Sequence, residues 1–443
     1  MRRQDRNRAD RLSARTRADP VSRSELLARW QHQTETEGAG LIPVHLPIVG
    51  HVWIAITHGA AAAVLKDARR FTVRRQPGGR VAGLSWWMPK TLRILTHSML
   101  TQDDPDHGRL RGMVDRVFAR QGILALEPRV EAIARHLLET VSETGANDLV
   151  SSYTRPLPLL VICELLGISQ DERDAFAKDA EFLSRITSVT SFARALWPLR
   201  RLRLRVENMI ARAMDPIRSG SNGEDVQNKQ NQGLLHGLVA EHMRQQDGPE
   251  PFSRDELVSM VFLLLVAGHE TTTHALAGSI ALLAAQNKGQ LSALDGSPLQ
   301  VEECLRSVSA VEFSKARFCQ TNGRFFGAEV EAGDLVMASL AAANHDPTKF
   351  DDPMAFDPER RPNPHIQFGA GSHFCLGHQL ARLEIAVGLR VLGKTFPHGL
   401  IDAKAIIRRP RLGMAVIERL PMQRGQRVKA SSKADTKKGP TAP

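Results

Sequence analysis

The chain has 443 residues, and 42% of them are hydrophobic, which is enough for a large buried core. Residues 1–20 and 423–443 contribute +4 and +5 to the net charge of +11, so the basic excess lies mainly in two polar ends and does not indicate nucleic-acid binding. The four cysteines form no CxxC pair, which argues against a zinc site or a disulfide framework and favours a reducing, cytoplasmic compartment.

No linker divides the chain, so we expect one folded domain. It should span residues 23–422, with polar, disordered basic tails at 1–22 and 423–443. Residues 219–232 are polar and predict a surface loop. No apolar run reaches the roughly 20 residues of a membrane span, and the N-terminus lacks an apolar signal-peptide core.

Helical periodicity dominates the chain. Apolar residues recur at three- and four-residue spacing over 130–144, 198–214 and 254–285. Ser253 followed by Glu256 predicts a capping box at the start of the third helix. Short strand-like pieces occur at 52–56, 330, 335–337 and 414–417. The pattern predicts a mainly α protein with a minor β-sheet region.

The first motif in chain order is DPDHGRLR, at 104–111. His107 and Arg111 are four residues apart and share a helix face. Taken alone, such a pair is usually part of a solvated surface.

A second motif, AGHETTT at 267–273, follows the wholly apolar run 261–266 in the long helix. Gly268 lacks a side chain and can open a groove, with the carboxyl of Glu270 and the hydroxyl of Thr271 beside it. An acid and an alcohol so placed can relay protons into an otherwise dry site. The alternative is a threonine-rich bend without chemistry.

Glu303 and Arg306 form an E-x-x-R pair on one helix face. Such a pair is usually an exposed ion pair of little energetic value.

The most informative segment is FGAGSHFCLG, at 368–377, followed by an amphipathic run from 378 to 392. Gly369 and Gly371 permit backbone conformations that a side chain would forbid, so the loop can bring Cys375 close to a flat ligand. The following helix start should favour the thiolate of Cys375 over the thiol. A buried structural cysteine in a glycine-rich turn is the alternative.

The ten-residue segment resembles the cytochrome P-450 pattern F-G-x-G-x-H-x-C-x-G at every fixed position. The matching residues are Phe368, Gly369, Gly371, His373, Cys375 and Gly377. The segment at 267–273 is similar to the family's oxygen-binding motif, A-G-x-[D/E]-T-T. The resemblance covers about 43–421, and it implies the cytochrome P-450 fold, a single domain shaped like a triangular prism.

The resemblance also implies roles. Cys375 would be the metal ligand of haem b, Phe368 would pack near the sulfur, and Glu270 and Thr271 would serve dioxygen activation. The haem contacts would include Ala267, Gly268, Gly369 and Gly377. The haem propionates would be held by His107, Arg111, Arg317 and His373. Arg360 would join Glu303 and Arg306 in a structural network that braces the cysteine loop.

The implied activity is a monooxygenase reaction that uses dioxygen and two external electrons to oxidise a small apolar organic substrate. Pocket candidates from the resemblance are Trp86, Trp87, Phe182, Val266, Val311 and Phe313. We expect a monomer. The chain holds no reductase or flavin motif, so a ferredoxin or flavodoxin with its reductase should supply electrons. It would dock on a basic patch formed by Arg109, Arg116, His378 and Arg382.

Ala310 and His378 depart from residues usual in the family, at the pocket and at the cysteine face respectively. Other classes stay open. One is a haem-thiolate binding or sensor protein without turnover, and another is a peroxide-driven peroxygenase. The third is a non-haem basic helical binding protein.

Overall fold

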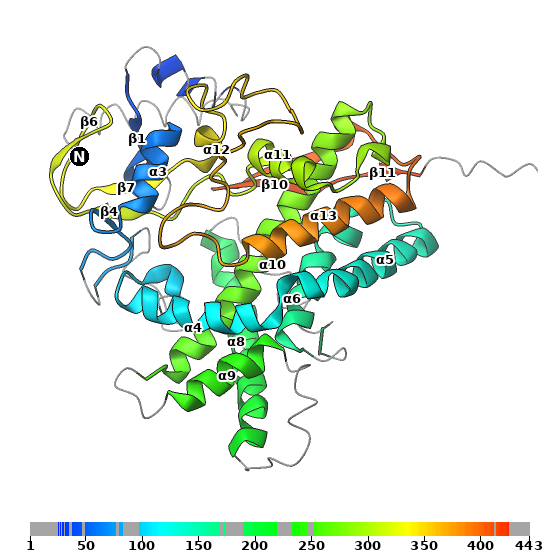
Figure 1. Cartoon of the computed structure of the whole chain (residues 1–443), viewed down its shortest axis with the longest axis horizontal. Helices are drawn as coiled ribbons and strands as arrows, with labels where there is room; N and C mark the ends of the chain where they lie inside the picture. The colour runs from blue at the N-terminus through cyan, green and yellow to red at the C-terminus, as the bar shows by residue number, and fades with distance from the viewer. Residues whose placement is uncertain are drawn as a thin grey trace, which may run out of the picture.

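The computed structural model describes residues 38–46, 49–76, 79–82, 97–168, 172–173, 189–218, 233–245, 251–411 and 413–424, with parts of 25–34. Figure 1 shows a mainly helical molecule in which the long helix α10 runs through the middle and α13 crosses it. The strands β1, β4 and β7 lie to one side with α3, and α4, α8 and α9 lie below.

The helices are α3 (His58–Lys66), α4 (Asp106–Gln121), α5 (Glu127–Thr144), α6 (Pro156–Leu166), α8 (Val189–Arg218), α9 (Leu234–Arg244), α10 (Arg254–Gln286), α11 (Pro298–Val308), α12 (Leu340–Ala343) and α13 (His378–Thr395). The short helical turns are η2 (Met99–Thr101), η3 (Ile123–Leu126), η4 (Val150–Thr154), η7 (Leu291–Ala293) and η8 (Ala403–Ala405). The strands are β1 (Leu41–Leu46), β2 (Gly50–Ala55), β3 (Phe71–Thr72), β4 (Arg317–Cys319), β5 (Gly323–Phe325), β6 (Ala328–Val330), β7 (Leu335–Ala338), β8 (Leu400–Ile401), β9 (Ile407–Arg411), β10 (Met414–Arg419) and β11 (Met422–Gln423).

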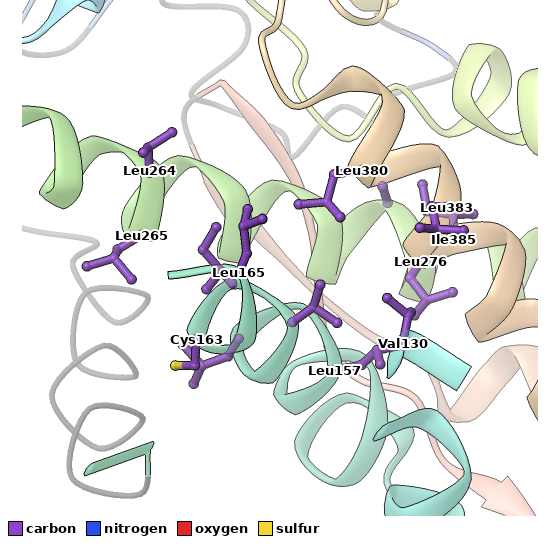
Figure 2. Packing of buried hydrophobic residues seen from close by; sticks show 14 of the residues in the cluster. Val130, Leu157, Cys163, Leu165, Leu264, Leu265, Leu276, Leu380, Leu383 and Ile385 are labelled. Carbon is purple, nitrogen blue, oxygen red and sulfur yellow. The ribbon is translucent and has the colours of Figure 1, made fainter. Parts of the chain in front are cut away.

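Helix α10 is the centre of the core. The Ser253 side chain accepts from the backbone N–H of Glu256 while the Glu256 carboxylate accepts from the N–H of Ser253, which is the predicted capping box. Buried residues occur on all sides of the helix because α6, α11 and α13 pack around it. Figure 2 shows Leu157 and Leu165 of α6, and Leu380, Leu383 and Ile385 of α13, beside Leu264, Leu265 and Leu276 of α10.

A five-stranded sheet with the order β1-β2-β7-β4-β3 forms the second part of the fold. Strands β2 and β7 are parallel, with Trp53 opposite Val336, and the other neighbours are antiparallel. Strand β4 places Arg317 opposite Val336 in the interior of this sheet. The sheet therefore fixes the position of one residue of the predicted site.

The predicted helices and strands all appear, with ends shifted by a few residues; the first helix begins at Glu127 and the second spans 189–218. None of the helices in the described part of the chain is long and apolar enough to cross a membrane. The ordered chain continues past residue 422, because Gln423 belongs to β11 and Arg424 donates to the carbonyl oxygen of Ser142 at 2.9 Å.

Candidate active site

The cysteine loop has the predicted glycine conformations. Gly369 and Gly371 both have φ of +74°, in the left-handed region. A Cβ at position 371 would lie only 2.4 Å from the carbonyl oxygen of Leu65, at the end of α3. The N–H of Cys375 donates to the carbonyl oxygen of Phe368 at 2.9 Å. The loop is thus a tight turn pressed against α3, and α13 starts three residues after the cysteine.

Burial of the Cys375 thiol acts against the predicted thiolate. Burial raises the pKa of the Cys375 thiol more than the backbone N–H of Gly377 and the charges of Arg111 and Arg382 lower it. The helix start alone therefore does not produce a thiolate, because Cys375 lies before the N-cap, Gly377, and is largely desolvated. A cationic ligand on the sulfur has to supply the missing stabilisation.

The four cysteines all lie in the described part of the chain, and only one of them is partly exposed. Cys163, Cys304 and Cys319 are buried, and burial raises the pKa of Cys163 and of Cys304 to about 12. Cys375 is thus the cysteine that a ligand can reach.

The middle of α10 has an uncovered strip at the second predicted motif. Ala267 is exposed, and Val266, Gly268, Glu270 and Thr271 are half-buried, although the helix is otherwise packed on both sides. Val266 packs at the edge of the main core cluster, as do Phe368 and Leu376 of the cysteine loop. The strip and the cysteine loop therefore both border the main core cluster.

Two details of this strip bear on its chemistry. The hydroxyl of Thr271 donates to the carbonyl oxygen of Ala267 at 2.8 Å. A Cβ at Gly268 would lie 3.6 Å from Cδ1 of Ile162 on α6, an ordinary contact, so packing does not require glycine at this position. The uncovered surface comes from Ala267 rather than from a groove at Gly268.

Helix α4 and strand β4 bring cations to the cysteine loop. The rings of His107 and His373 are in contact, tilted by 45° with their centroids 4.1 Å apart, and the Arg111 guanidinium donates to the carbonyl oxygen of Phe374 at 2.6 Å. Arg317 reaches in from β4 and donates to three backbone carbonyl oxygens, those of Val64, Leu65 and Phe71. The four predicted propionate ligands thus come from three separate elements to one place.

Lys315, which no sequence motif indicated, joins this cluster in the structure. Burial and the repulsion of nearby cations lower the pKa of His373 to about 3, and Lys315, Arg317, His107 and Arg111 are among those cations. Burial and the charge of Arg74 lower the pKa of Lys315 to about 7, against the pull of Asp103. The cluster is therefore a set of charges that oppose one another.

The acids near this cluster lie at its edge: Asp104 contacts Nδ1 of His107 at 3.4 Å, and Asp115 pairs with Arg111 at 3.2 Å. Within the described residues no carboxylate pairs with Arg317, which is 3% exposed and donates to backbone carbonyl oxygens, and Nε2 of His107 is buried without a hydrogen-bond partner. Burying cations without a counter-charge is costly. A ligand that carries two carboxylates beside a planar iron-bearing ring fits this donor set and a reachable cysteine, so the residues present fit haem.

The predicted ion-pair network is fully formed. Nε and Nη2 of Arg306 bind the two carboxylate oxygens of Glu303 at 2.8 and 2.6 Å, and both side chains are fully buried. Arg360 adds a contact of 3.3 Å to Glu303. Arg306 also donates to the carbonyl oxygen of Asn344, whose side-chain oxygen accepts from the N–H of Ile366. The network thus reaches the start of the cysteine loop through Asn344, a residue that no sequence motif indicated.

The pocket candidates divide into two groups. Phe313 packs edge-on against Trp30, with centroids 6.2 Å apart, and Val311 forms a bridge to Met414 and packs against the sheet cluster. Trp86, Trp87 and Phe182 lie outside the described residues. The assignment of these residues to a substrate pocket stays a prediction.

The predicted basic docking patch is wrong in two of its four members. Arg109 pairs with Glu256 at 2.5 Å and Arg116 with Glu241 at 2.7 Å, both on the side of α4 that faces α9 and α10. They lie on nearly the opposite face of α4 from Arg111, because each residue turns the helix by about 100°. His378 and Arg382 do lie by the cysteine loop, where Arg382 pairs with Glu302 at 2.5 Å.

A surface hollow of about 420 Å³ opens on the cysteine side of the molecule. One wall is α4 with Arg111 and Asp115, another is residues 122–125, and the floor is residues 376–380, directly after Cys375. Leu124 is 76% exposed on its wall. An electron donor bound at this hollow would lie next to the residues that follow the cysteine.

Comparison with known proteins agrees with this geometry. The family model described as cytochrome P-450 matches residues 83–291 and 299–421. The 6-deoxyerythronolide B hydroxylase of Saccharopolyspora erythraea is 32% identical, covering 84% of this chain and 90% of that protein. The vitamin D(3) 25-hydroxylase of Pseudonocardia autotrophica is 34% identical and covers 78% of this chain and 79% of its own length. The solved structure of MoxA from Nonomuraea recticatena matches with a TM-score of 0.76 and 28% identity, over 90% of this chain and 95% of that one.

The fold and the site together define an enzyme that binds haem through a cysteine. The chain belongs to the cytochrome P-450 family and has the cytochrome P-450 fold. It is a monooxygenase that activates dioxygen with externally supplied electrons to oxidise an organic substrate.

Proposed function

We propose that the cofactor is haem b with Cys375 as its axial ligand, and that His107, Arg111, Arg317 and His373 hold its two carboxylates. The observation that carries this is the cation cluster around His373 beside the one reachable cysteine, in which the buried Arg317 has no paired carboxylate among the described residues. Iron coordination would stabilise the thiolate that burial disfavours. The bound haem supplies the site at which dioxygen is activated.

Thr271 and Glu270 deliver protons to the oxygen site. Thr271 lies on the uncovered strip of α10, and its hydroxyl is tethered to its own helix by one bond to the carbonyl oxygen of Ala267. That bond fixes the hydroxyl oxygen near the strip while leaving it able to accept a proton. Glu270, on the preceding helical position, can replace the proton that the hydroxyl passes on.

Coupling efficiency tests this assignment. We expect Thr271→Ala and Glu270→Gln to keep normal haem content and to release more hydrogen peroxide per electron pair consumed, with any substrate that shifts the haem spectrum. Thr273→Ala is the matched control, because the Thr273 hydroxyl makes the same kind of bond, to the carbonyl oxygen of His269 at 2.9 Å, but is buried. Unchanged coupling in both Thr271→Ala and Glu270→Gln would remove Thr271 and Glu270 from the proposed relay.

A small apolar molecule is the proposed substrate class. The described part of the strip contributes Val266 and Ala267, which are apolar, and Val311 and Phe313 remain candidates for the wall. The relatives are named as hydroxylases of 6-deoxyerythronolide B and of vitamin D(3), both organic molecules.

A ferredoxin, with its reductase, is the proposed electron donor, and it docks at the hollow beside residues 376–380. Arg111 lines this hollow with His378, and Arg382 lies next to it, one turn along α13 from His378. Leu124→Ser should slow the first electron transfer while leaving the carbonyl spectrum unchanged, and Leu204→Ser on α8 serves as an exposed-leucine control. Equal reduction rates in the two variants would place the donor elsewhere.

A further inference from the structure

Lys315 lies on the same side of the chain as Arg317. Residues 314–316 lead into β4, which begins at Arg317, and side chains two positions apart in extended backbone point the same way. Both side chains are shielded from solvent to some degree, since Arg317 is buried and Lys315 is half-buried. Lys315 therefore approaches the cation cluster from the same side as Arg317, two positions earlier in the chain.

The ammonium of Lys315 has spare hydrogen-bonding capacity. It donates from Nζ to the carbonyl oxygen of Leu100 at 3.4 Å, which is long for a hydrogen bond. An ammonium carries three N–H donors. Asp103 is the acid whose charge acts on Lys315, but its carboxylate oxygens accept from the backbone N–H groups of Val73 and Arg74.

Lys315 also lies between the two groups of propionate ligands. Leu100 belongs to η2, which leads into α4 with His107 and Arg111, whereas Arg317 belongs to β4. The contact with Leu100 thus places the Lys315 ammonium between β4 and the chain that leads into α4. A carboxylate held between Arg317 and His373 would have this ammonium as a neighbour.

We infer that Lys315 is a third cationic ligand of a haem carboxylate, which it binds together with Arg317. This inference rests on the proposed haem site and adds a residue to it. The ion pair would give the half-buried ammonium a carboxylate in direct contact. Lys315 would then serve to retain haem, and would not take part in oxygen activation.

A carboxylate could instead come from the substrate. The position of Lys315 beside Arg317 favours the haem, because Arg317 belongs to the cation cluster around His373 and not to the uncovered strip on α10. The experiment therefore needs one measurement without substrate and one with an acidic substrate.

The first measurement is the rate of haem transfer from the ferric holoenzyme, free of substrate, to excess apomyoglobin. We expect Lys315→Met to lose haem about 10-fold faster than the wild type, and Lys315→Arg to remain within about 3-fold of it. Lys404→Met, an exposed lysine on η8, is the matched control and should leave the rate unchanged. A Lys315→Met rate equal to that of Lys404→Met overturns the inference.

The second measurement separates the two carboxylates. Lauric acid is titrated into each variant, and its dissociation constant is read from the haem spectral shift. Normal haem retention in Lys315→Met with at least 10-fold weaker lauric acid binding would assign Lys315 to a substrate acid and overturn the inference. All variants must show the thiolate-type carbonyl spectrum; its absence from the wild type would instead contradict the proposed function.

Discussion

Gly371 is a position in the cysteine loop where any residue other than glycine would be strained. Its φ of +74° is unfavourable for any other residue, and a Cβ would collide with the carbonyl oxygen of Leu65. We expect Gly371→Ala to cost at least about 2 kcal/mol of stability and to lower haem content. Gly59→Ala on α3 is the control, since its nearest neighbour would be Phe326 at 4.0 Å. Thermal unfolding and the haem-to-protein ratio measure both effects, and equal values for the two variants would contradict this account of the loop.

Glu384 is a buried acid without a counter-charge. It lies on α13 at 2% exposure, its Oε2 has no hydrogen-bond partner, and burial raises its pKa well above the ordinary value. The folded protein therefore holds a proton that the unfolded chain releases at an ordinary carboxyl pKa. The contribution of Glu384 to the free energy of unfolding is complete below its unfolded pKa. Between the unfolded pKa and the higher folded pKa, this contribution declines by about 1.4 kcal/mol for each unit of rising pH.

Glu384→Gln should remove this dependence, because glutamine resembles the protonated acid in shape. We expect the variant to match the wild type near pH 4 and to be more stable at pH 8. Denaturant unfolding at several pH values measures the difference. A wild type that is the more stable of the two at pH 8 would show that the carboxylate is ionised and stabilised in the fold.

At the scale of elements, α11 is tied to the chain ahead of the cysteine loop. Burial opposes ionisation of Glu303, but the bonds from Arg306 and from the N–H of Asp357 lower the pKa of the Glu303 carboxyl. The network therefore stabilises the fold above the unfolded pKa of Glu303, and this stability is lost as the pH falls through the lower folded pKa.

Breaking this network should be severe. Glu303→Gln leaves the fully buried Arg306 without its counter-charge, so we expect a loss of about 3–5 kcal/mol and poor haem retention. Glu131→Gln, at the half-buried surface pairs of Glu131 with Arg135 and Arg390, should cost no more than about 1 kcal/mol. The unfolding midpoints of the two variants give the comparison. A small effect in both would mean that the network does not brace the loop.

Element types were predictable from sequence, whereas the faces they present to one another were not. The capping box at Ser253 and the period of α10 are local signals, so they were read correctly. Arg109 and Arg116 were assigned to the wrong face, because their partners Glu256 and Glu241 are distant in sequence. Lys315 and Asn344 were missed for the same reason: each acts through a partner more than 20 residues away.

On the scale of the whole molecule, the site lies where the helical core meets the sheet. The cysteine loop packs on α3, Arg317 enters from β4, and His107 and Arg111 come from α4. Haem would contact the helical core and the sheet at once. Its two carboxylates would supply negative charge to the cations of the site. Removing haem should therefore lower the unfolding temperature, by the equivalent of about 4 kcal/mol when haem is at a thousandfold excess over its dissociation constant. Calorimetry of the apo and reconstituted proteins measures this, and equal unfolding temperatures would argue against a site shared by the two parts.

The central claim is that the sulfur of Cys375 binds the haem iron. The carbonyl difference spectrum of the reduced protein tests it most directly, because a thiolate ligand shifts the main absorption band to the red. We predict the red-shifted band in the wild type and in Cys319→Ser, whose buried thiol donates to the carbonyl oxygen of Thr321, and its loss in Cys375→Ser. A red-shifted band that persists in Cys375→Ser would contradict the account.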